Sequence, residues 1–164
     1  MSMAIRNRVP HIVLLYWVIK IASTTLGETG ADMFSMTFEL GYAETIGIFM
    51  ALFLALFAIK LALKGYHPVA YWLTFTATAI VGTAISDFID RTLGLGYALG
   101  SALLVGLLII VLFAWYKKEG SVQVETITTP GAEVFYGVAF FIGNSRGPEA
   151  GDFLADDLGL GFLT

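Results

Sequence analysis

The chain has 164 residues, of which 57% are hydrophobic and only 13% carry a charge. Soluble domains carry about 25% charged residues, so this composition excludes a soluble globule and predicts an integral protein of the lipid bilayer. The net charge of −4 excludes a basic surface for nucleic acid, and the absence of cysteine excludes disulfides, thiolate metal sites and cysteine nucleophiles.

Five apolar runs follow one another along the chain, at residues 12–34, 43–63, 69–89, 98–116 and 134–154. Each is close to the about 20 residues that a helix needs to cross a hydrocarbon core of about 30 Å. We interpret all five as helices, because an open strand would leave backbone polar groups unpaired in lipid. The sequence therefore predicts an all-α, polytopic membrane protein with about five transmembrane helices in a single domain, residues 1–164.

Basic residues gather at one end of these alternating spans. Six of the nine Lys and Arg fall on that side, namely Arg6, Arg8, Lys60, Lys64, Lys117 and Lys118. The positive-inside rule then predicts a multi-pass protein with its N-terminus in the cytoplasm. The acids at or near the long polar connection, Glu119, Glu125 and Glu133, are expected to be solvated.

One pattern, Tyr-x10-Gly-x4-Asp-x7-Leu-Gly-aromatic, occurs three times without a gap inside any copy. The copies begin at Tyr16, Tyr71 and Tyr136, which are 55 and 65 residues apart. We place the copies at about 10–64, 65–118 and 130–164, the last one incomplete. Because a complete copy holds two spans, successive copies have the same orientation, as parallel two-helix repeats about an axis along the membrane normal.

Each odd-numbered span also carries small residues four positions apart. They are Ser23, Gly27 and Ala31, then Thr78, Gly82 and Ser86, then Gly143, Gly147 and Gly151. This spacing lets helix backbones approach closely where no hydrophobic effect drives helices together. We interpret the three sets as helix-packing seams.

A polar stripe runs along the first span, nearly opposite its small residues. Thr25, Glu28, Thr29 and Asp32 follow the spacing i, i+3, i+4, i+7, which places them on one face of a helix. Lys20 lies in the middle of the same span, where a lysine costs about 2.5–3.5 kcal/mol, so it should face water or a carboxylate. Glu28 lies two turns above it, and we interpret the two as a coupled titratable pair.

The aspartate of each copy stands in the same column of the pattern, as Asp32, Asp87 and Asp152. If the copies surround one axis, these carboxylates lie at one height near the outer mouth. Such a ring concentrates cations, and hard divalent ions prefer oxygen ligands, which the hydroxyls of Thr25, Thr29 and Thr83 would supplement. The leading hypothesis is a transporter or permeation protein for a small cation, a proton or a divalent metal; the identity of any metal is left open.

The alternative is a structural or interaction protein whose repeats only pack helices. In that interpretation the aspartates lie in the headgroup zone, where an acid costs little. The chain contains no nucleophile elbow, no glycine-rich phosphate loop after a strand and no His-Glu-x-x-His. The sequence therefore predicts a protein that is not an enzyme and needs no cofactor.

The segments "YWVIKIASTTLGETGADMFS", "YWLTFTATAIVGTAISDFIDRTLGLGYALGSALL", "FYGVAFF" and "GDFLADDLGLGF" resemble a bacterial family of uncharacterised membrane-anchored proteins built from a short repeat of unknown function. The resemblance covers nearly the whole chain and implies a helical protein of the bacterial inner (cytoplasmic) membrane. Members of that family usually look like four copies. We therefore expect either a further C-terminal repeat beyond Thr164 or a homo-oligomer that supplies the missing helices.

Overall fold

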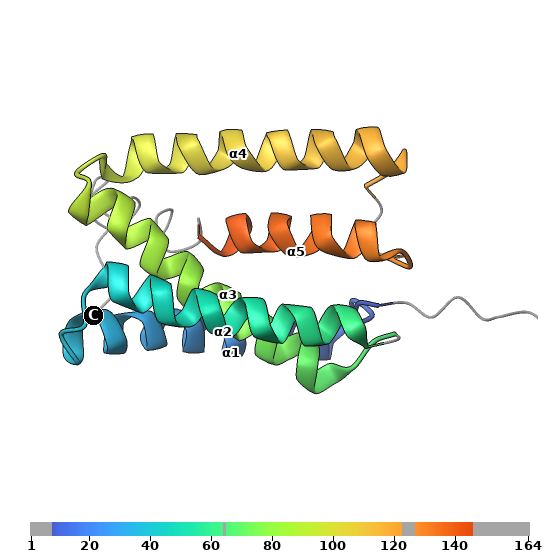
Figure 1. Cartoon of the computed structure of the whole chain (residues 1–164), viewed down its shortest axis with the longest axis horizontal. Helices are drawn as coiled ribbons and strands as arrows, with labels where there is room; N and C mark the ends of the chain where they lie inside the picture. Colours follow the sequence, from blue (N-terminus) through green and yellow to red (C-terminus); the bar gives the residue numbers. More distant parts are fainter. Residues whose placement is uncertain (1–7, 64, 123–126, 146–164) are drawn as a thin grey trace, which may run out of the picture.

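The computed structural model describes residues 8–63, 65–122 and 127–145, which form five α-helices and no strand (Figure 1). In chain order the helices are α1 Leu14–Asp32, α2 Tyr42–Ala62, α3 Pro68–Asp87, α4 Gly96–Glu119 and α5 Pro130–Asn144. Each helix overlaps one of the five predicted apolar runs. The predicted all-α class is therefore confirmed.

Local signals in the sequence explain where several helices begin and end. Pro68 and Pro130 stand in the first turns of α3 and α5, where a missing backbone N–H costs nothing. The side chain of Thr129 accepts a hydrogen bond from the backbone N–H of Ala132 and so caps α5. Gly120 ends α4 in the left-handed conformation, with φ of 74°.

The first two copies of the repeat follow the same backbone course after their first helix. A five-residue π-helical turn directly follows α1 at Met33–Thr37, and another directly follows α3 at Phe88–Thr92. A glycine with positive φ then precedes or begins the next helix: Gly41, the N-cap of α2, has φ of 82°, and Gly96, the first residue of α4, has φ of 71°. A residue with a side chain is strained at positive φ, whereas glycine is not. This explains why glycine recurs in the Leu-Gly-aromatic element of the repeat.

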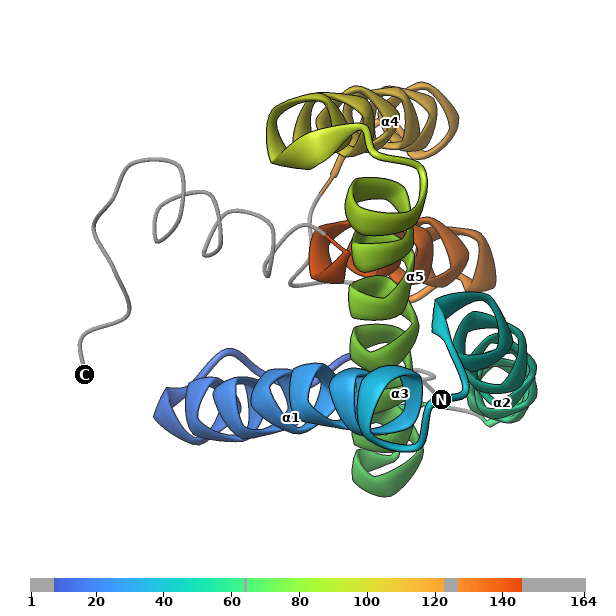
Figure 2. The ribbon, with the colours of Figure 1, turned by 90° about the vertical axis from the view of Figure 1, so that its left-hand side faces the viewer.

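The helices alternate in direction, as the repeat predicts. In Figure 1, α1, α3 and α5 run one way and α2 and α4 run back, so the parallel arrangement of two-helix repeats is confirmed. Figure 2 shows α3 crossing the bundle between α1, α2 and α5. This central position agrees with burial, since 61% of the most apolar part of the 68–92 span is buried, against 22% for the span of α2.

Three of the described helices are long and apolar enough to cross a membrane, at residues 42–62, 68–92 and 98–119. Large apolar side chains of α2 and α4, such as Leu54, Ile110 and Phe113, are exposed on the outside of the bundle. Exposed leucine, isoleucine and phenylalanine over whole helix faces are the expected surface of a protein that faces lipid. The described chain thus has the helices and the apolar surface of a helical membrane protein.

The small residues of α1 and α3 are buried, and two of their glycines mark close helix crossings. A Cβ atom added to Gly27 would lie 2.2 Å from the Cβ of Ala79, and one added to Gly82 would lie 2.8 Å from the backbone nitrogen of Ser145 and 3.0 Å from the carbonyl carbon of Asn144. Ala79 and Asn144 are equivalent positions of the second and third copies. The contact between α1 and α3 is therefore repeated between α3 and α5.

The third set of small residues differs from the other two. Gly143 is exposed at the end of α5, and an added Cβ there would meet open space. Gly147 and Gly151 lie outside the described residues. The close approach that the small residues predict is thus seen for the seams of α1 and α3.

Candidate functional site

The predicted aspartates lie at the ends of the odd-numbered helices. Asp87 is buried, and its carboxylate is 3.5 Å from the guanidinium Nε of Arg91, one turn further on. Asp32 occupies the equivalent place at the end of α1 and is half-buried, while Asp152 lies outside the described residues. The structure thus brings two aspartates to the same end of the bundle, and the ring of three stays a prediction.

The polar stripe of α1 faces outward from the described bundle. Thr25 and Thr29 are exposed, and the Thr29 hydroxyl donates a hydrogen bond to the backbone carbonyl of Thr25 over 2.8 Å. Glu28 is half-buried. The physical reason is that α3 packs on the opposite, small-residue face of α1. By contrast, Thr83 of α3 is buried in the interior.

Lys20 is half-buried and lies among aromatic rings. Its ammonium nitrogen is 5.0 Å from the centroid of the Trp17 ring and 5.6 Å from that of Phe140, which are cation–π distances. Trp17 lies toward the beginning of α1, whereas Glu28 lies two turns in the other direction. The structure therefore gives Lys20 aromatic neighbours, and the Lys20–Glu28 pair stays a prediction.

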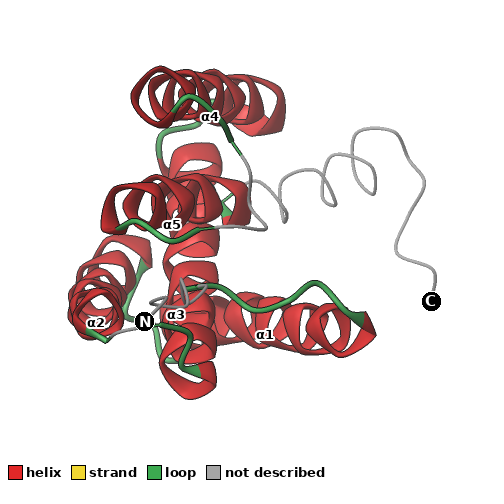
Figure 3. Cartoon of the chain, turned by 90° about the vertical axis from the view of Figure 1, so that its right-hand side faces the viewer, coloured by secondary structure: helices red, strands yellow, loops and turns green. Residues whose placement is uncertain are grey.

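Figure 3 views the backbone from the end of the bundle opposite Asp32 and Asp87, where α2 ends and α5 begins. A buried ion network lies at this end. The Arg8 guanidinium and the Lys60 ammonium each donate a hydrogen bond to one carboxylate oxygen of Glu133. The exposed fraction of the side chain is 1% for Glu133, 12% for Arg8 and 8% for Lys60. The expectation that Glu133 is solvated is therefore wrong.

Helix termini explain how this network forms. Because α5 begins at Pro130, Glu133 lies in its first turn, where the helix dipole favours an acid. Lys60 lies in the last turn of α2. The Arg8 guanidinium also donates to the backbone carbonyls of Leu61 and Leu63, over 2.8 and 3.2 Å, and so satisfies the end of α2. The network therefore joins the N-terminal segment, α2 and α5.

A signal for Glu133 was present in the sequence. Thr129 followed by Pro130 is the combination expected at a helix start, and it places that start four residues before Val134. Counting from there, Glu133 shares a helix face with Tyr136, three residues on. Hydropathy alone does not show this, because it starts the helix at Val134 and assigns Glu133 to the preceding loop.

The repeated tyrosines meet beside the network. The hydroxyl oxygens of Tyr71 and Tyr136 are 2.8 Å apart, in a buried hydrogen bond, and Tyr16 interacts with both residues. The Lys60 ammonium is 5.7 Å from the centroid of the Tyr71 ring. The tyrosine column of the repeat is therefore a contact in three dimensions, and it adjoins the ion network.

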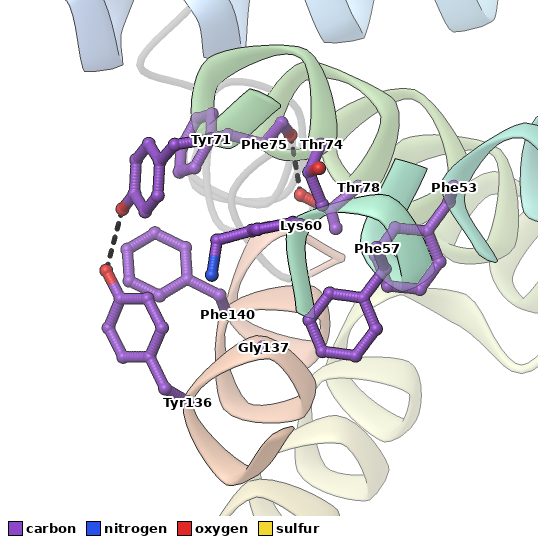
Figure 4. A pocket seen from close by; sticks show the side chains of 10 residues that line it. All are labelled: Phe53, Phe57, Lys60, Tyr71, Thr74, Phe75, Thr78, Tyr136, Gly137 and Phe140. Carbon is purple, nitrogen blue, oxygen red and sulfur yellow. Dashed lines mark hydrogen bonds between the residues drawn. The ribbon is translucent and has the colours of Figure 1, made fainter. Parts of the chain in front are cut away.

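A cavity of about 30 Å³ lies between α2, α3 and α5 at this place (Figure 4). Ten residues line it: Phe53, Phe57, Lys60, Tyr71, Thr74, Phe75, Thr78, Tyr136, Gly137 and Phe140. Cavities above about 10–15 Å³ on this measure can hold a water molecule if polar partners are present. The surface of this cavity is almost entirely apolar, because the polar groups of Lys60, the two tyrosines and the two threonines are hydrogen-bonded to other partners.

Buried polar side chains continue from this cavity along α3. They are Tyr71, Thr74, Thr78, Thr83, Ser86 and Asp87. At about 1.5 Å per residue this series extends over about 24 Å, most of the thickness of a hydrocarbon core. In the described part of the chain, the hydroxyl oxygens of Thr83 and Ser86 have no hydrogen-bond partner. A buried hydroxyl without a partner costs about 1–3 kcal/mol, which a bound water molecule would offset.

Removing one hydroxyl of the tyrosine pair is expected to destabilise the protein by about 1 kcal/mol, because the other hydroxyl loses its partner. Tyr71→Phe and Tyr136→Phe should each show this loss in the free energy of unfolding, measured by circular dichroism in detergent micelles. The double variant should lose no more than either single variant, because it removes both hydroxyls and leaves no buried hydroxyl of the pair without its partner. Losses that simply add would contradict a direct hydrogen bond.

Comparison with known proteins identifies the repeat. A family model described as "Repeat of Unknown Function (DUF347)" matches residues 15–66 and again residues 70–121. The two matched segments begin at positions separated by the same interval as Tyr16 and Tyr71. No curated protein and no solved structure matches the chain.

Proposed function

The chain belongs to this family of repeats, and we propose that it is a membrane transport or permeation protein for a small cation, the proton. The observation that carries the proposal is the buried polar series of α3. It begins beside the Arg8–Glu133–Lys60 network and ends at Asp87, and so places buried polar groups between ionisable groups near both ends of the bundle. Ionisable side chains inside a membrane bundle mark ion pathways and proton relays.

The ligands of the network favour the proton over a metal ion. Both carboxylate oxygens of Glu133 accept from cationic side chains, so the network offers no vacant carboxylate oxygen to Mn²⁺, Zn²⁺ or Ca²⁺. In the ranges that the structure describes, no three His, Asp or Glu side chains gather into a site for a metal. A proton needs no such cage, because it moves between hydrogen-bonded hydroxyls, water and titratable groups.

The aspartates of the repeat belong to the other end of the proposed pathway, opposite the ion network. Asp87 is buried beside the end of the polar series, and Asp32 and Asp152 share its column in the repeat. Each described member directly precedes a π-helical turn, a local distortion that is frequent at functional sites. These carboxylates would attract protons at the mouth of the pathway.

The structural alternative has its own support. The hydroxyls of Thr24, Thr29, Thr74 and Thr76 each donate to the backbone carbonyl four residues earlier, as membrane threonines without a functional role do. Glu133 accepts from two cations, which fixes α2 against α5. In this alternative the protein only holds helices together and moves no ion.

Proton flux into liposomes tests the proposal. Purified protein is reconstituted with a pH-sensitive dye inside, and a potassium diffusion potential drives protons inward. Thr83→Val replaces a buried hydroxyl that has no partner in the described structure by a methyl group, so it should fold at least as well as the parent. We expect its proton flux to fall about tenfold, because a methyl group cannot bind a water molecule at this point of the pathway.

Thr76→Val is the matched control on the same helix. Its hydroxyl is half-buried and donates to the backbone carbonyl of Trp72 over 3.0 Å, so flux should stay at the parental rate. Asp87→Asn should also slow the flux. A parent protein that acidifies liposomes no faster than lipid alone would favour the structural alternative, and equal flux in Thr83→Val would exclude the α3 pathway.

A further inference from the structure

A second, larger hollow adjoins the inner cavity. It is an open groove of about 300 Å³, lined by residues of α4 and α5 and by Lys20 of α1. The groove reaches from Val122, just beyond α4, to Asn144 at the end of α5. Two of its lining residues, Tyr136 and Phe140, also line the inner cavity that holds Lys60. These two side chains therefore form the wall between the groove and the cavity.

The Phe140 ring is held in this wall by contacts with three other side chains. Its centroid is 4.6 Å from that of Tyr136 and 5.3 Å from that of Phe75, and the Lys20 ammonium is 5.6 Å away. Aromatic contacts of this kind are weak and orientation-dependent, so rotation of a single ring can break them. Phe140 thus closes the wall between the groove and the inner cavity, and rotation of its ring would open that wall.

Lys20 gives the groove a charge that the other two copies of the repeat lack. The equivalent positions are Phe75 and Phe140, whose rings contact each other edge to face. In the described structure no carboxylate forms a salt bridge with Lys20, so the groove carries a half-buried positive charge at bilayer depth. Such a charge repels cations in a medium of low dielectric constant and leaves neutral water unaffected.

We propose that this groove is the vestibule through which water enters the inner cavity, with Phe140 as its gate and Lys20 as the residue that excludes dissolved cations. The inference rests on the proposed function, because it supplies the route by which the water that would carry protons reaches the Lys60–Glu133 network. It also explains why a lysine occupies a column that is otherwise phenylalanine.

Access to the cavity can be measured directly, because the chain contains no cysteine. Thr74→Cys places a single thiol in the wall of the inner cavity, where Thr74 is buried. The full chain in liposomes is treated with a cationic and a neutral methanethiosulfonate reagent of similar size. We expect Phe140→Ala to raise the labelling rate with both reagents about tenfold, since the wall then opens. Phe140→Leu should give an intermediate rate.

Two further variants separate the gate from the charge. Val138→Ala changes an exposed residue of the same helix that lines neither hollow, and should leave labelling at the Thr74→Cys rate. Lys20→Gln should speed labelling by the cationic reagent and leave the neutral reagent unchanged. Equal labelling in Phe140→Ala and Val138→Ala would overturn the gate, and equal acceleration of both reagents in Lys20→Gln would overturn the charge filter.

This experiment distinguishes the route from the transport activity. Labelling requires only that the reagent reaches the thiol introduced by Thr74→Cys, and no proton need cross the membrane. Fast labelling of Phe140→Ala in a protein without proton flux would uphold the groove as an access route and remove its role in transport. Proton flux with no effect of Phe140→Ala on labelling would uphold transport and overturn this route.

Discussion

Glu133→Ala is expected to lower the free energy of unfolding by about 3–5 kcal/mol, because it removes the carboxylate that Arg8 and Lys60 share. The two cations would remain beside each other in the interior of the bundle. Their repulsion is added to the cost of keeping them out of water. Unfolding followed by circular dichroism in detergent micelles measures the loss.

Two further variants show whether the effect comes from uncompensated charge. Glu44→Ala removes an exposed acid in the first turn of α2 and should cost at most about 1 kcal/mol. Adding Lys60→Met to Glu133→Leu removes one cation together with the carboxylate, while Arg8 keeps its bonds to the end of α2. We expect this pair to recover more than half of the loss. A Glu133→Ala variant as stable as Glu44→Ala would show that the network contributes nothing.

Gly27→Ala is expected to destabilise the protein by about 1–3 kcal/mol, since an added methyl group cannot fit between α1 and α3. The nearest atoms belong to Ala79 and include its backbone carbonyl carbon at 3.1 Å, so no flexible side chain can move aside. The two helices must separate instead. The same unfolding experiment in micelles gives the change in free energy.

Gly47→Ala is the matched control, because a Cβ added at Gly47 of α2 meets nothing within 4 Å. Alanine has a higher helix propensity than glycine, so this variant should be stabilised by up to about 1 kcal/mol. Gly82→Ala should resemble Gly27→Ala, since both glycines stand at equivalent crossings. If Gly27→Ala and Gly47→Ala had the same stability, the close crossing of α1 and α3 would be refuted.

The fold was largely predictable because its signals are local and repeated. Apolar runs give the helices, and the interval between Tyr16 and Tyr71 gives the two-helix unit. The family match confirms the interval, and the structure shows the shared direction of the units. The positive φ of Gly41 and Gly96 shows why the Leu-Gly-aromatic element recurs. Such features depend on a few neighbouring residues, so they can be recognised in the sequence without a structure.

The buried network was not predictable in the same way. Arg8 and Glu133 are 125 residues apart, and Lys60 and Glu133 are 73 residues apart, so no local pattern connects them. Hydropathy assigned Arg8 and Lys60 to the membrane surface, where they supported the orientation of the chain. Because both form ion pairs with Glu133, fewer basic residues at that end of the bundle are left to interact with the membrane surface. The cytoplasmic N-terminus stays a prediction.

The tyrosine column shows where sequence and structure complement each other. Counting residues places Tyr16, Tyr71 and Tyr136 in equivalent positions, and only the packing of α1, α3 and α5 shows that they meet. The same packing turns the polar stripe of α1 outward and keeps Thr83 of α3 inside. Equivalent columns therefore acquire different surroundings in each copy.

The crossing of α1 on α3 recurs between α3 and α5, with Gly27 on Ala79 matched by Gly82 on Asn144. Each unit thus offers one surface to its successor and a different one to its predecessor, as in a heterologous head-to-tail assembly. An ancestral hairpin needed to acquire this joint only once. Tandem duplication of its gene would then have extended the protein with a binding surface already in place. Individual copies could afterwards diverge at other positions, as the first copy has at Lys20.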